Sequence, residues 1–404
     1  MSFLIPSRKA RPGDDPIFAL NTEARRRAAA GEKIINATVG SLLTDDGSLA
    51  TLPTVVETLH ATPAHVAAGY APISGSADFL GGVINDLLGG MPAVDWATAV
   101  ATPGGTGALR HAIANFLEAG QSVLTTSFFW GPYKTLADES DRKLATFDTF
   151  DASGGLDVAS FEAALRDLLA KQGRALVLLN SPCHNPTGYS FTNAESQALA
   201  SILRGVSKLG PITVCLDVAY ARFGGSAGLR TMLEEVVALA PDVLPLVAWS
   251  ASKTFLQYGL RIGALVAVHP DAEERRRIES ALAYSCRGTW SNVNAGGMAA
   301  IAKILKDPEL AARVDRERDA FVVLLGRRVA TWNTFAVTKG LRYPRYDGGF
   351  FTTVFTANAF DVARRLKEQG IFVVPQEGAI RVALCSVPEA DIERLVEGIA
   401  AAID

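Results

Sequence analysis

A lysine near residue 250 has the surroundings of a reactive amine. Lys253 lies in SASKTFLQYGLRIG, residues 250–263, which begins where the apolar run VLPLVAW ends. A lysine among small hydroxyl residues at a strand end can lose its proton if it is desolvated or lies near a cation, and can then attack a carbonyl carbon. Arg261, eight positions later, could bind a phosphate with its planar guanidinium. The competing interpretation is an ordinary solvated surface lysine.

Three further polar residues follow apolar runs. Asp217 lies near the end of ITVCLDV, where an unpaired carboxylate is costly and requires a cationic or hydrogen-bonding partner, such as a protonated pyridine nitrogen. Tyr220 supplies a phenol and Asn185, in SPCHNPTG, supplies an amide. Each has a structural alternative: Asp217 could cap a helix and NPTG could be a type I turn. Trp130, after SVLTTSFF, offers a flat face for a ring or is a core residue.

A glycine-rich stretch predicts an anion site. Residues 102–110 read TPGGTGALR, which indicates a strand end, a turn and the start of a helix with free backbone N–H groups. The G-x-G-x-x-G pattern fails because Arg110 stands where glycine is required, and the P-loop fails because G-K-[ST] is absent. The stretch is therefore either a phosphate cradle or simply a turn.

The elements that position these residues alternate between strands and helices. From about Trp96 onward, short apolar runs separate helical patterns, which predicts an α/β fold with a mostly parallel sheet covered on both faces. Ligands of such sheets bind at the carboxyl ends of the strands. We expect an N-terminal arm with part of a small domain over residues 1–45, a large domain over 46–300, and a smaller α+β domain over 301–404.

Composition excludes several classes of protein. The chain has 404 residues, 49% of them hydrophobic, and Lys+Arg 39 nearly balance Asp+Glu 42. This balance gives no footprint for nucleic acid or an anionic membrane, so we expect small-molecule partners. Met1 to Ala10 places its apolar stretch before its basic residues, unlike a secretory signal, and no apolar run is long enough to span a membrane. The four cysteines form no C-x-x-C pair, so we expect a cytoplasmic protein.

Taken together and in this order, TPGGTGALR, FFWGPYK, SPCHNPTG, DVAYARF and SASKTFLQYGLRIG resemble the fold-type I class I aminotransferases, in particular the aspartate and aromatic aminotransferase branch. The resemblance spans nearly the whole chain. It includes DDPIFAL, INATVGSLLTDDG, GYAPISGSADF, SCRGTWSN and GAIRVAL.

The resemblance implies pyridoxal 5'-phosphate as cofactor, held as a Schiff base on Lys253. Asp217 would pair with the pyridine nitrogen, Asn185 and Tyr220 would bind the ring hydroxyl oxygen, and Trp130 would lie on the ring. The phosphate would be bound by Gly105, Thr106, Ser250, Ser252, Arg261 and, from a second subunit, Tyr70. Lys253, Asp217 and Tyr220 would be the catalytic residues, and no metal is implied.

The resemblance also implies a substrate site and a homodimer. Arg381 would bind the substrate α-carboxylate, with Gly40, Asn185 and Trp130 close by, and Arg287 of the partner subunit would meet a side-chain carboxylate. The expected reaction moves the amino group of an L-amino acid, whether aspartate, glutamate or aromatic, to a 2-oxo acid such as 2-oxoglutarate. Tyr133 stands where aspartate-specific members carry histidine, and WSNVNAGG replaces their Y-S-N-P-P, so both departures concern specificity.

Several alternatives compete with this function. A lyase or decarboxylase could use the same cofactor motifs, since these do not fix which substrate bond breaks. A cofactor-binding transcription regulator would need a basic helix-turn-helix, for which the pattern starting by Asp15 leaves no room. G-G-S-A-G at residues 224–228 suggests a serine hydrolase but lacks the strand-turn-helix elbow. His60 and His65 have no acidic or thiol neighbours that would favour a metal site.

Overall fold

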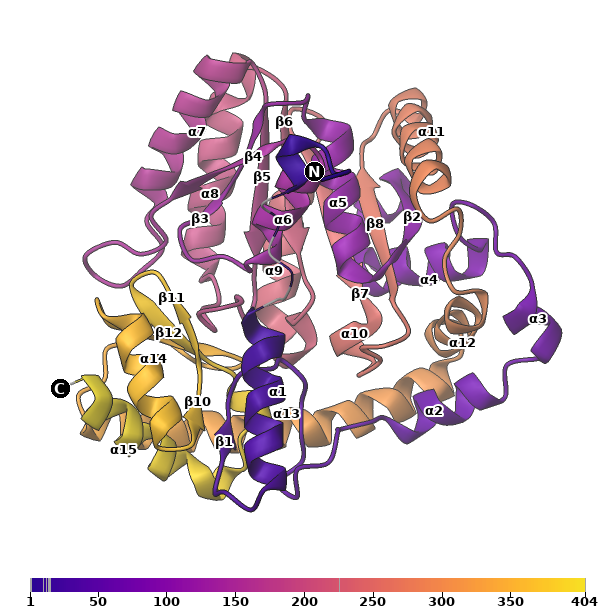
Figure 1. Ribbon diagram of the computed structural model, residues 1–404. Coiled ribbons are helices and arrows are strands. Elements are labelled where there is room, and N and C mark those ends of the chain that lie inside the picture. Colours follow the sequence, from indigo (N-terminus) through magenta and orange to yellow (C-terminus); the bar gives the residue numbers. More distant parts are fainter. Residues whose placement is uncertain (1, 10, 12, 14–15, 225, 404) are drawn as a thin grey trace. The chain divides into compact units, whose positions relative to one another are not determined.

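The computed structural model describes residues 2–9, 11, 13, 16–224 and 226–403 (Figure 1). The chain divides into two compact units: unit 1 is Met1–Leu49, Arg327–Pro344 and Phe350–Asp404, and unit 2 is Ala50–Gly326 and Arg345–Gly349. The comparison of residues 1–10 with a secretory signal, and the start of the motif pattern at Asp15, fall partly outside the described residues.

The boundaries differ from those expected at residues 45 and 300. Helix α12 (Ala295–Lys306) contacts α2 (Pro53–His60), α3 (Ala64–Ala68) and α4 (Ala77–Leu88), all of which belong to unit 2. In the first part of α13 (Pro308–Thr338), Arg318 donates to the main-chain oxygen of Thr254. Residues 301–326 therefore belong to the larger unit, because their buried contacts are made there, and the boundary falls inside α13.

Within the described part of unit 2, seven strands form one sheet in the order β2-β8-β7-β6-β5-β3-β4. Their bounds are Ala97–Pro103 (β2), Ser122–Thr126 (β3), Lys143–Phe147 (β4), Ala175–Asn180 (β5), Ile212–Asp217 (β6), Leu244–Ser250 (β7) and Ile262–Val268 (β8). β8 runs antiparallel to β2 and β7, and the other neighbouring pairs are parallel. The connection from β7 to β8 spans only residues 251–261, shorter than the dozen or so residues of a typical parallel crossover, so β8 turns back along β7.

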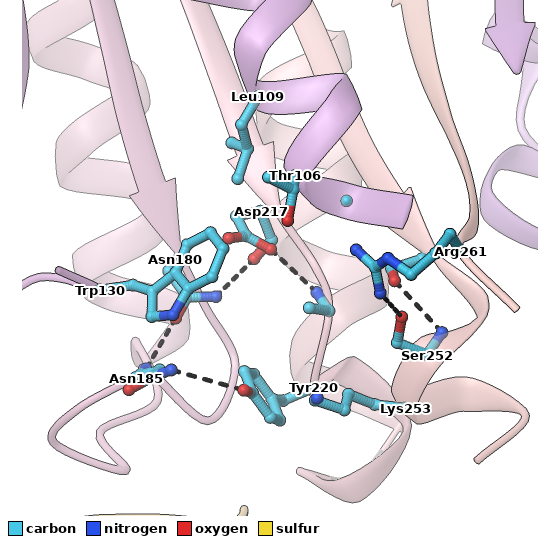
Figure 2. Close-up of a pocket in the computed structure, with 13 residues that line it drawn as sticks. Thr106, Leu109, Trp130, Asn180, Asn185, Asp217, Tyr220, Ser252, Lys253 and Arg261 are labelled. Carbon is cyan, nitrogen blue, oxygen red and sulfur yellow. Dashed lines mark hydrogen bonds between the residues drawn. The ribbon is translucent and has the colours of Figure 1, made fainter. Parts of the chain in front are cut away.

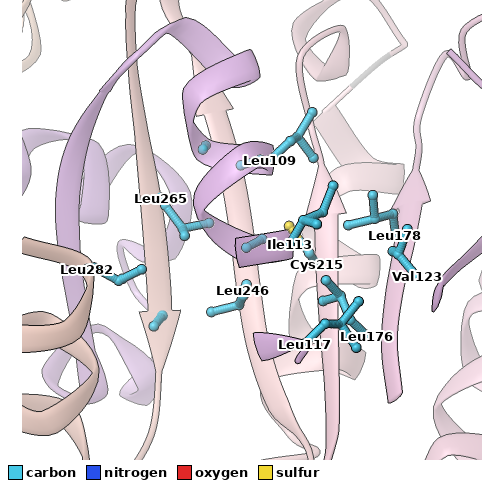
Figure 3. Packing of buried hydrophobic residues seen from close by; sticks show 14 of the residues in the cluster. Leu109, Ile113, Leu117, Val123, Leu176, Leu178, Cys215, Leu246, Leu265 and Leu282 are labelled. Atoms are coloured by element: carbon cyan, nitrogen blue, oxygen red, sulfur yellow. The ribbon is translucent and has the colours of Figure 1, made fainter. Parts of the chain in front are cut away.

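Helices cover both faces of this sheet, since β5, β6 and β8 are buried at every residue. The remaining helices of unit 2 are α5 (Gly104–Phe116), α6 (Pro132–Glu139), α7 (Val158–Gln172), α8 (Asn193–Val206), α9 (Ser226–Val237), α10 (Ala251–Thr254) and α11 (Ala272–Thr289). Side chains from α5, α6 and α11 pack on one face, including Leu109, Ile113 and Leu282 (Figure 3). The expected α/β fold with a mostly parallel sheet is confirmed.

Unit 1 mixes helices with short strands. β1 (Ile35–Asn36) pairs in parallel with β10 (Ile371–Phe372), and β11 (Val374–Gln376), β12 (Ala379–Val382) and β9 (Thr352–Phe355) form an antiparallel sheet. The helices are α1 (Pro16–Ala29), α14 (Ala359–Glu368), α15 (Ile392–Ile403) and the second part of α13. Arg328, fully buried, donates to Asp45 and to the main-chain oxygens of Leu43 and Cys385, so it holds the N-terminal segment to the C-terminal one.

Among the described residues, no helix is long and apolar enough to cross a membrane. The same residues contain no group of three or more His, Cys, Asp or Glu side chains that could hold a metal ion.

Candidate active site

Two polar residues end neighbouring strands of the sheet. Asn180 is the last residue of β5 and Asp217 the last of β6, and the two are direct partners in the parallel register. Asp217 follows Cys215 by two positions and therefore faces the same side of the sheet, toward α5 and α6. The sheet register thus brings a carboxylate and an amide side by side at the carboxyl ends of the strands, where ligands bind.

Asp217 is a buried residue, 6% exposed. Its Oδ2 accepts a hydrogen bond from Oη of Tyr133 at 2.8 Å, and its Oδ1 accepts one from the main-chain N–H of Ala219 at 3.1 Å. Burial raises the pKa of the Asp217 carboxyl, while these two donors and the charge of Lys253 act in the opposite direction. A cation placed beside Asp217 would favour the ionised carboxylate, so this end of the site is suited to a positively charged ring nitrogen.

A chain of amides continues from Asp217. Asn180 donates from Nδ2 to the main-chain oxygen of Asp217 at 2.8 Å, and its Oδ1 accepts the main-chain N–H of Asn185 at 2.7 Å. Asn185 in turn donates from Nδ2 to Oη of Tyr220 at 3.4 Å (Figure 2). All four residues are buried, so their relative positions are fixed by one connected network.

The opposite side of the site is built where β2, β7 and β8 meet. Gly263 on β8 pairs with Thr102 on β2 and with Ser250 on β7, so Arg261 lies beside the start of α5. Nη1 of Arg261 donates to Oγ of Ser252 at 3.3 Å, and the main-chain N–H of Ser252 donates to Oγ of Ser250 at 3.2 Å (Figure 2).

The start of α5 completes this side. The helix begins directly at Gly104 and has no side-chain cap, which leaves the N–H groups of its first turn available to an anion. Together with the guanidinium and the two hydroxyl groups, these N–H groups form a set of donors that suits a phosphate.

Lys253 lies between these two sides, on the short helix α10. Its Nζ is 4.5 Å from the ring centroid of Tyr258 and 5.7 Å from that of Tyr220, and the residue is half-buried. Figure 2 shows the lysine side chain running alongside Tyr220. An amine therefore stands in the same pocket as the Asp217 carboxylate and the Arg261 guanidinium.

One pocket gathers most of the residues singled out from the sequence. It is lined by Gly105, Thr106, Trp130, Asn185, Asp217, Tyr220, Ser250, Ser252, Lys253 and Arg261. Leu109, Asn180 and Ala219 also line it and were not predicted. Asn180 could have been predicted from the sequence, because it is a polar residue at the end of an apolar strand, as Asp217 is in β6.

Four predicted residues are not among those that line this pocket. Tyr70 is 96% exposed and Arg287 is exposed on α11, where it donates to Oγ of Ser291. Gly40 and Arg381 belong to unit 1. There Arg381, on β12, donates to the main-chain oxygen of Thr38 at 2.6 Å and lies over the ring of Phe351 at 4.6 Å.

Tyr133 and the described residues of the G-G-S-A-G stretch, all noted in the sequence, do not line the pocket. Tyr133 is buried on α6 and bonded to Asp217, so its phenol points at the carboxylate. In the G-G-S-A-G stretch, Gly225 lies outside the described residues, and Ser226 begins helix α9 nine positions beyond the end of β6 rather than in a tight elbow.

The chain matches one known family over nearly its whole length. The model of the family "Aminotransferase class I and II" matches residues 32–399. The tyrosine aminotransferase of Klebsiella pneumoniae is 30% identical over 386 residues, covering 91% of this chain and 93% of that protein. The aspartate aminotransferase of Pseudomonas aeruginosa is 28% identical over 399 residues, covering 95% and 96%.

Solved structures agree with the sequence matches. The crystal structure of an aminotransferase from Anaerococcus prevotii superposes with a TM-score of 0.94 at 32% identity and covers 100% of both chains. An aromatic-amino-acid aminotransferase from Burkholderia pseudomallei, covalently bound to pyridoxal phosphate, has the same fold, with a TM-score of 0.79 at 24% identity and 100% coverage of both. The fold and site define an α/β enzyme of the aminotransferase class. The chain belongs to the family of class I and II aminotransferases, and the resemblance predicted from its motifs is confirmed.

Proposed function

We propose that this chain is a pyridoxal-phosphate-dependent aminotransferase that moves the amino group of an L-amino acid to a 2-oxo acid such as 2-oxoglutarate. The observation that carries the proposal is the pocket in which the amine of Lys253 lies between the buried carboxylate of Asp217 and the donor set around Arg261. These groups match the aldehyde, the ring nitrogen and the phosphate of one cofactor.

The residues present fit this cofactor on chemical grounds. Oδ1 of Asn185 is buried and has no hydrogen-bond partner among the described residues, which is costly unless a ligand supplies one or the amide turns toward it. Asp217 is buried in surroundings that disfavour its charge, so a pyridinium nitrogen would stabilise it.

Each group of the cofactor has residues to hold it. Lys253 would bind its aldehyde carbon as a Schiff base, and Asp217 its ring nitrogen. Asn185 and Tyr220 would bind the ring hydroxyl oxygen, and Trp130 would lie on the ring face. The phosphate would be bound by Gly105, Thr106, Ser250, Ser252 and Arg261, with Tyr70 of the partner subunit.

The reaction needs an electron sink and a base. When bound, the cofactor supplies a conjugated ring that accepts the electron pair of the broken Cα–H bond. Asp217 keeps the ring nitrogen protonated by lying beside it as a carboxylate. Nζ of Lys253, released when the substrate amine takes its place, would take the proton from Cα and deliver it to the former aldehyde carbon of the cofactor. Arg381 would hold the α-carboxylate, which fixes the bond that is cleaved.

Substrate range and assembly are further parts of the proposal. The named relatives act on tyrosine, aromatic amino acids and aspartate, and we propose that this chain uses aspartate, glutamate or aromatic donors. Tyr70 and Arg287 are exposed in the single chain, which supports a homodimer in which each residue reaches the partner's site. We also propose a cytoplasmic location, which the buried free cysteines support because they suit a reducing compartment.

Absorbance spectroscopy tests the proposal. Purified protein is mixed with pyridoxal phosphate and titrated with L-aspartate, L-tyrosine or L-glutamate, and the series is repeated with Lys253→Ala. Lys134→Ala, which changes an exposed lysine on α6, is the matched control. We expect the cofactor band of the wild type and the control to be converted by an amino acid and restored by 2-oxoglutarate.

Two other outcomes would contradict the proposed function. A band that forms but never cycles, with release of ammonia or carbon dioxide, would identify a lyase or decarboxylase on the same fold. Loss of the Lys253 dependence, with Lys253→Ala giving the wild-type spectrum, would contradict the assignment of this lysine.

A further inference from the structure

Tyr133 reaches the carboxylate of Asp217 from the helical layer. It is the second residue of α6 and is 1% exposed, and its Oη lies 2.8 Å from Oδ2 of Asp217. Its ring also meets Trp130 edge-on, with centroids 5.8 Å apart and planes at 88°. The phenol is therefore fixed from two sides.

The other groups around Asp217 show why the hydrogen bond from Tyr133 matters. The main-chain N–H of Ala219 donates to Oδ1, and the amine of Lys253 favours the charged carboxylate from a distance. Asn180 binds the main-chain oxygen and not the carboxylate. Cys215, two residues back on β6, and Tyr220 complete the titratable groups that interact with the Tyr133–Asp217 pair. Tyr133 is thus the side-chain donor to the carboxylate within the described chain.

We propose that Tyr133 is a positioning residue that keeps Asp217 ionised and turned toward the ring nitrogen of the cofactor. This inference rests on the proposed function, because it assigns Asp217 to that nitrogen. A donor to an ionised carboxylate forms one of the stronger hydrogen bonds in proteins, and here the carboxylate has little water to replace it.

A tyrosine suits this role because its charge state does not change at working pH. Burial, followed by the nearby Asp217 charge, raises the pKa of the Tyr133 phenol well above its ordinary value. The phenol therefore remains a neutral donor over the range in which Asp217 titrates. Tyr133 is also not among the residues that line the pocket, which favours an action through Asp217 over the contact with substrate that its place in the sequence suggested.

The affinity for pyridoxal phosphate, measured as a function of pH, tests the inference. Tyr133→Phe keeps the ring and removes the donor. We expect the dissociation constant to rise roughly tenfold at neutral pH, the effect of losing a hydrogen bond to a charged group. Because Asp217 then takes up a proton more readily, we also expect the acid-side loss of affinity to begin at higher pH.

Tyr189→Phe is the matched control. Tyr189 is also 1% exposed and donates to a carboxylate, Oε1 of Glu195 at 2.6 Å, but it does not line the pocket. This variant is expected to keep the wild-type affinity and pH profile. A purely structural role for Tyr133 would lower affinity equally at all pH values, and that result would overturn the inference.

Asp217→Asn separates the remaining explanations. An amide does not ionise, so this variant should lose the acid-side change in affinity, and adding Tyr133→Phe to it should cause no further loss. Persistence of the acid-side change in Asp217→Asn would overturn the inference even if Tyr133→Phe failed to fold. Failure of the wild-type protein to bind the cofactor would overturn the proposed function as well, whereas normal wild-type binding with an unchanged Tyr133→Phe would overturn this inference alone.

Discussion

The guanidinium of Arg261 occupies the space into which a side chain on Gly104 would project. A β-carbon built on Gly104 would lie 2.5 Å from Nη2 and 3.0 Å from Cζ of Arg261, and Gly104 has a φ of +71°. The first residue of α5 must therefore be glycine for the arginine to reach the helix start.

Gly104→Ala should consequently weaken the cofactor site. The methyl group displaces Arg261, and we expect the dissociation constant for pyridoxal phosphate to rise at least tenfold, as for loss of a charged hydrogen bond. Gly120→Ala is the control, because Gly120 has a φ of +83° and open space where the β-carbon would stand. Both variants bear a backbone cost of about 1–2 kcal/mol. If the two variants bound pyridoxal phosphate with equal affinity, the close approach of Arg261 to Gly104 would have no role in cofactor binding.

Asn180 is expected to contribute both to the stability of the fold and to cofactor binding. Asn180→Ala removes one donor and one acceptor from the buried network of Asp217 and Asn185, so we expect a loss of about 2 kcal/mol in unfolding free energy and a roughly tenfold weaker cofactor. Asn115→Ala removes a comparable pair of bonds, to His111 and Ser285, outside the pocket. Urea unfolding and cofactor titration of both variants check this. A loss of affinity in Asn115→Ala as large as in Asn180→Ala would count against the prediction.

Arg381→Lys should affect substrate and not cofactor. The planar guanidinium binds a carboxylate in two parallel hydrogen bonds, which an ammonium group cannot reproduce. We expect KM for the amino-acid donor to rise roughly a hundredfold. Arg364→Lys, an exposed change in unit 1, is the control. Steady-state kinetics with a cofactor titration measure both quantities, and a KM within about threefold of the wild type would refute the assignment of the α-carboxylate.

His111 should make the apoprotein less stable in acid. Its ring is fully buried and stacks on Trp290 with centroids 4.2 Å apart, and burial, with a smaller effect of Arg110, lowers its pKa to about 4. An unfolded histidine titrates near pH 6.5, so the unfolded chain takes up the proton first as the pH falls. Stability is therefore fully present above about pH 6.5 and decreases down to about pH 4.

Replacing His111 tests this dependence. Urea unfolding at several pH values should show that His111→Phe removes up to about 3 kcal/mol of the acid-induced loss. Part of the loss should remain, since burial also lowers the pKa of His184 to about 3. The exposed His65→Gln should behave like the wild type. The same pH dependence in His111→Phe and in the wild type would show that this histidine does not contribute.

Most residues of the pocket could be predicted from the sequence. Lys253, Asp217 and Asn185 each follow an apolar strand, and Gly105 follows another, so a mostly parallel sheet must bring them to one edge whatever the details of the fold. The order of the motifs along the chain was enough to identify the family, because that order fixes which strand is followed by the lysine, which by the carboxylate and which by the amide. The expected fold class followed from the same alternation of strands and helices.

The contacts that depend on strand register and on helix packing could not be predicted from the sequence. Asn180 bonds Asp217 because β5 and β6 pair at that residue, and Tyr133 reaches Asp217 because the carboxylate faces α6. The boundary of the large unit at residue 326 depends on where α12 and α13 bury their side chains, which no local signal marks. Periodicity in a sequence shows which face of an element is buried, but the partner of each buried polar atom is fixed only when the elements pack, since that choice depends on atoms from distant segments.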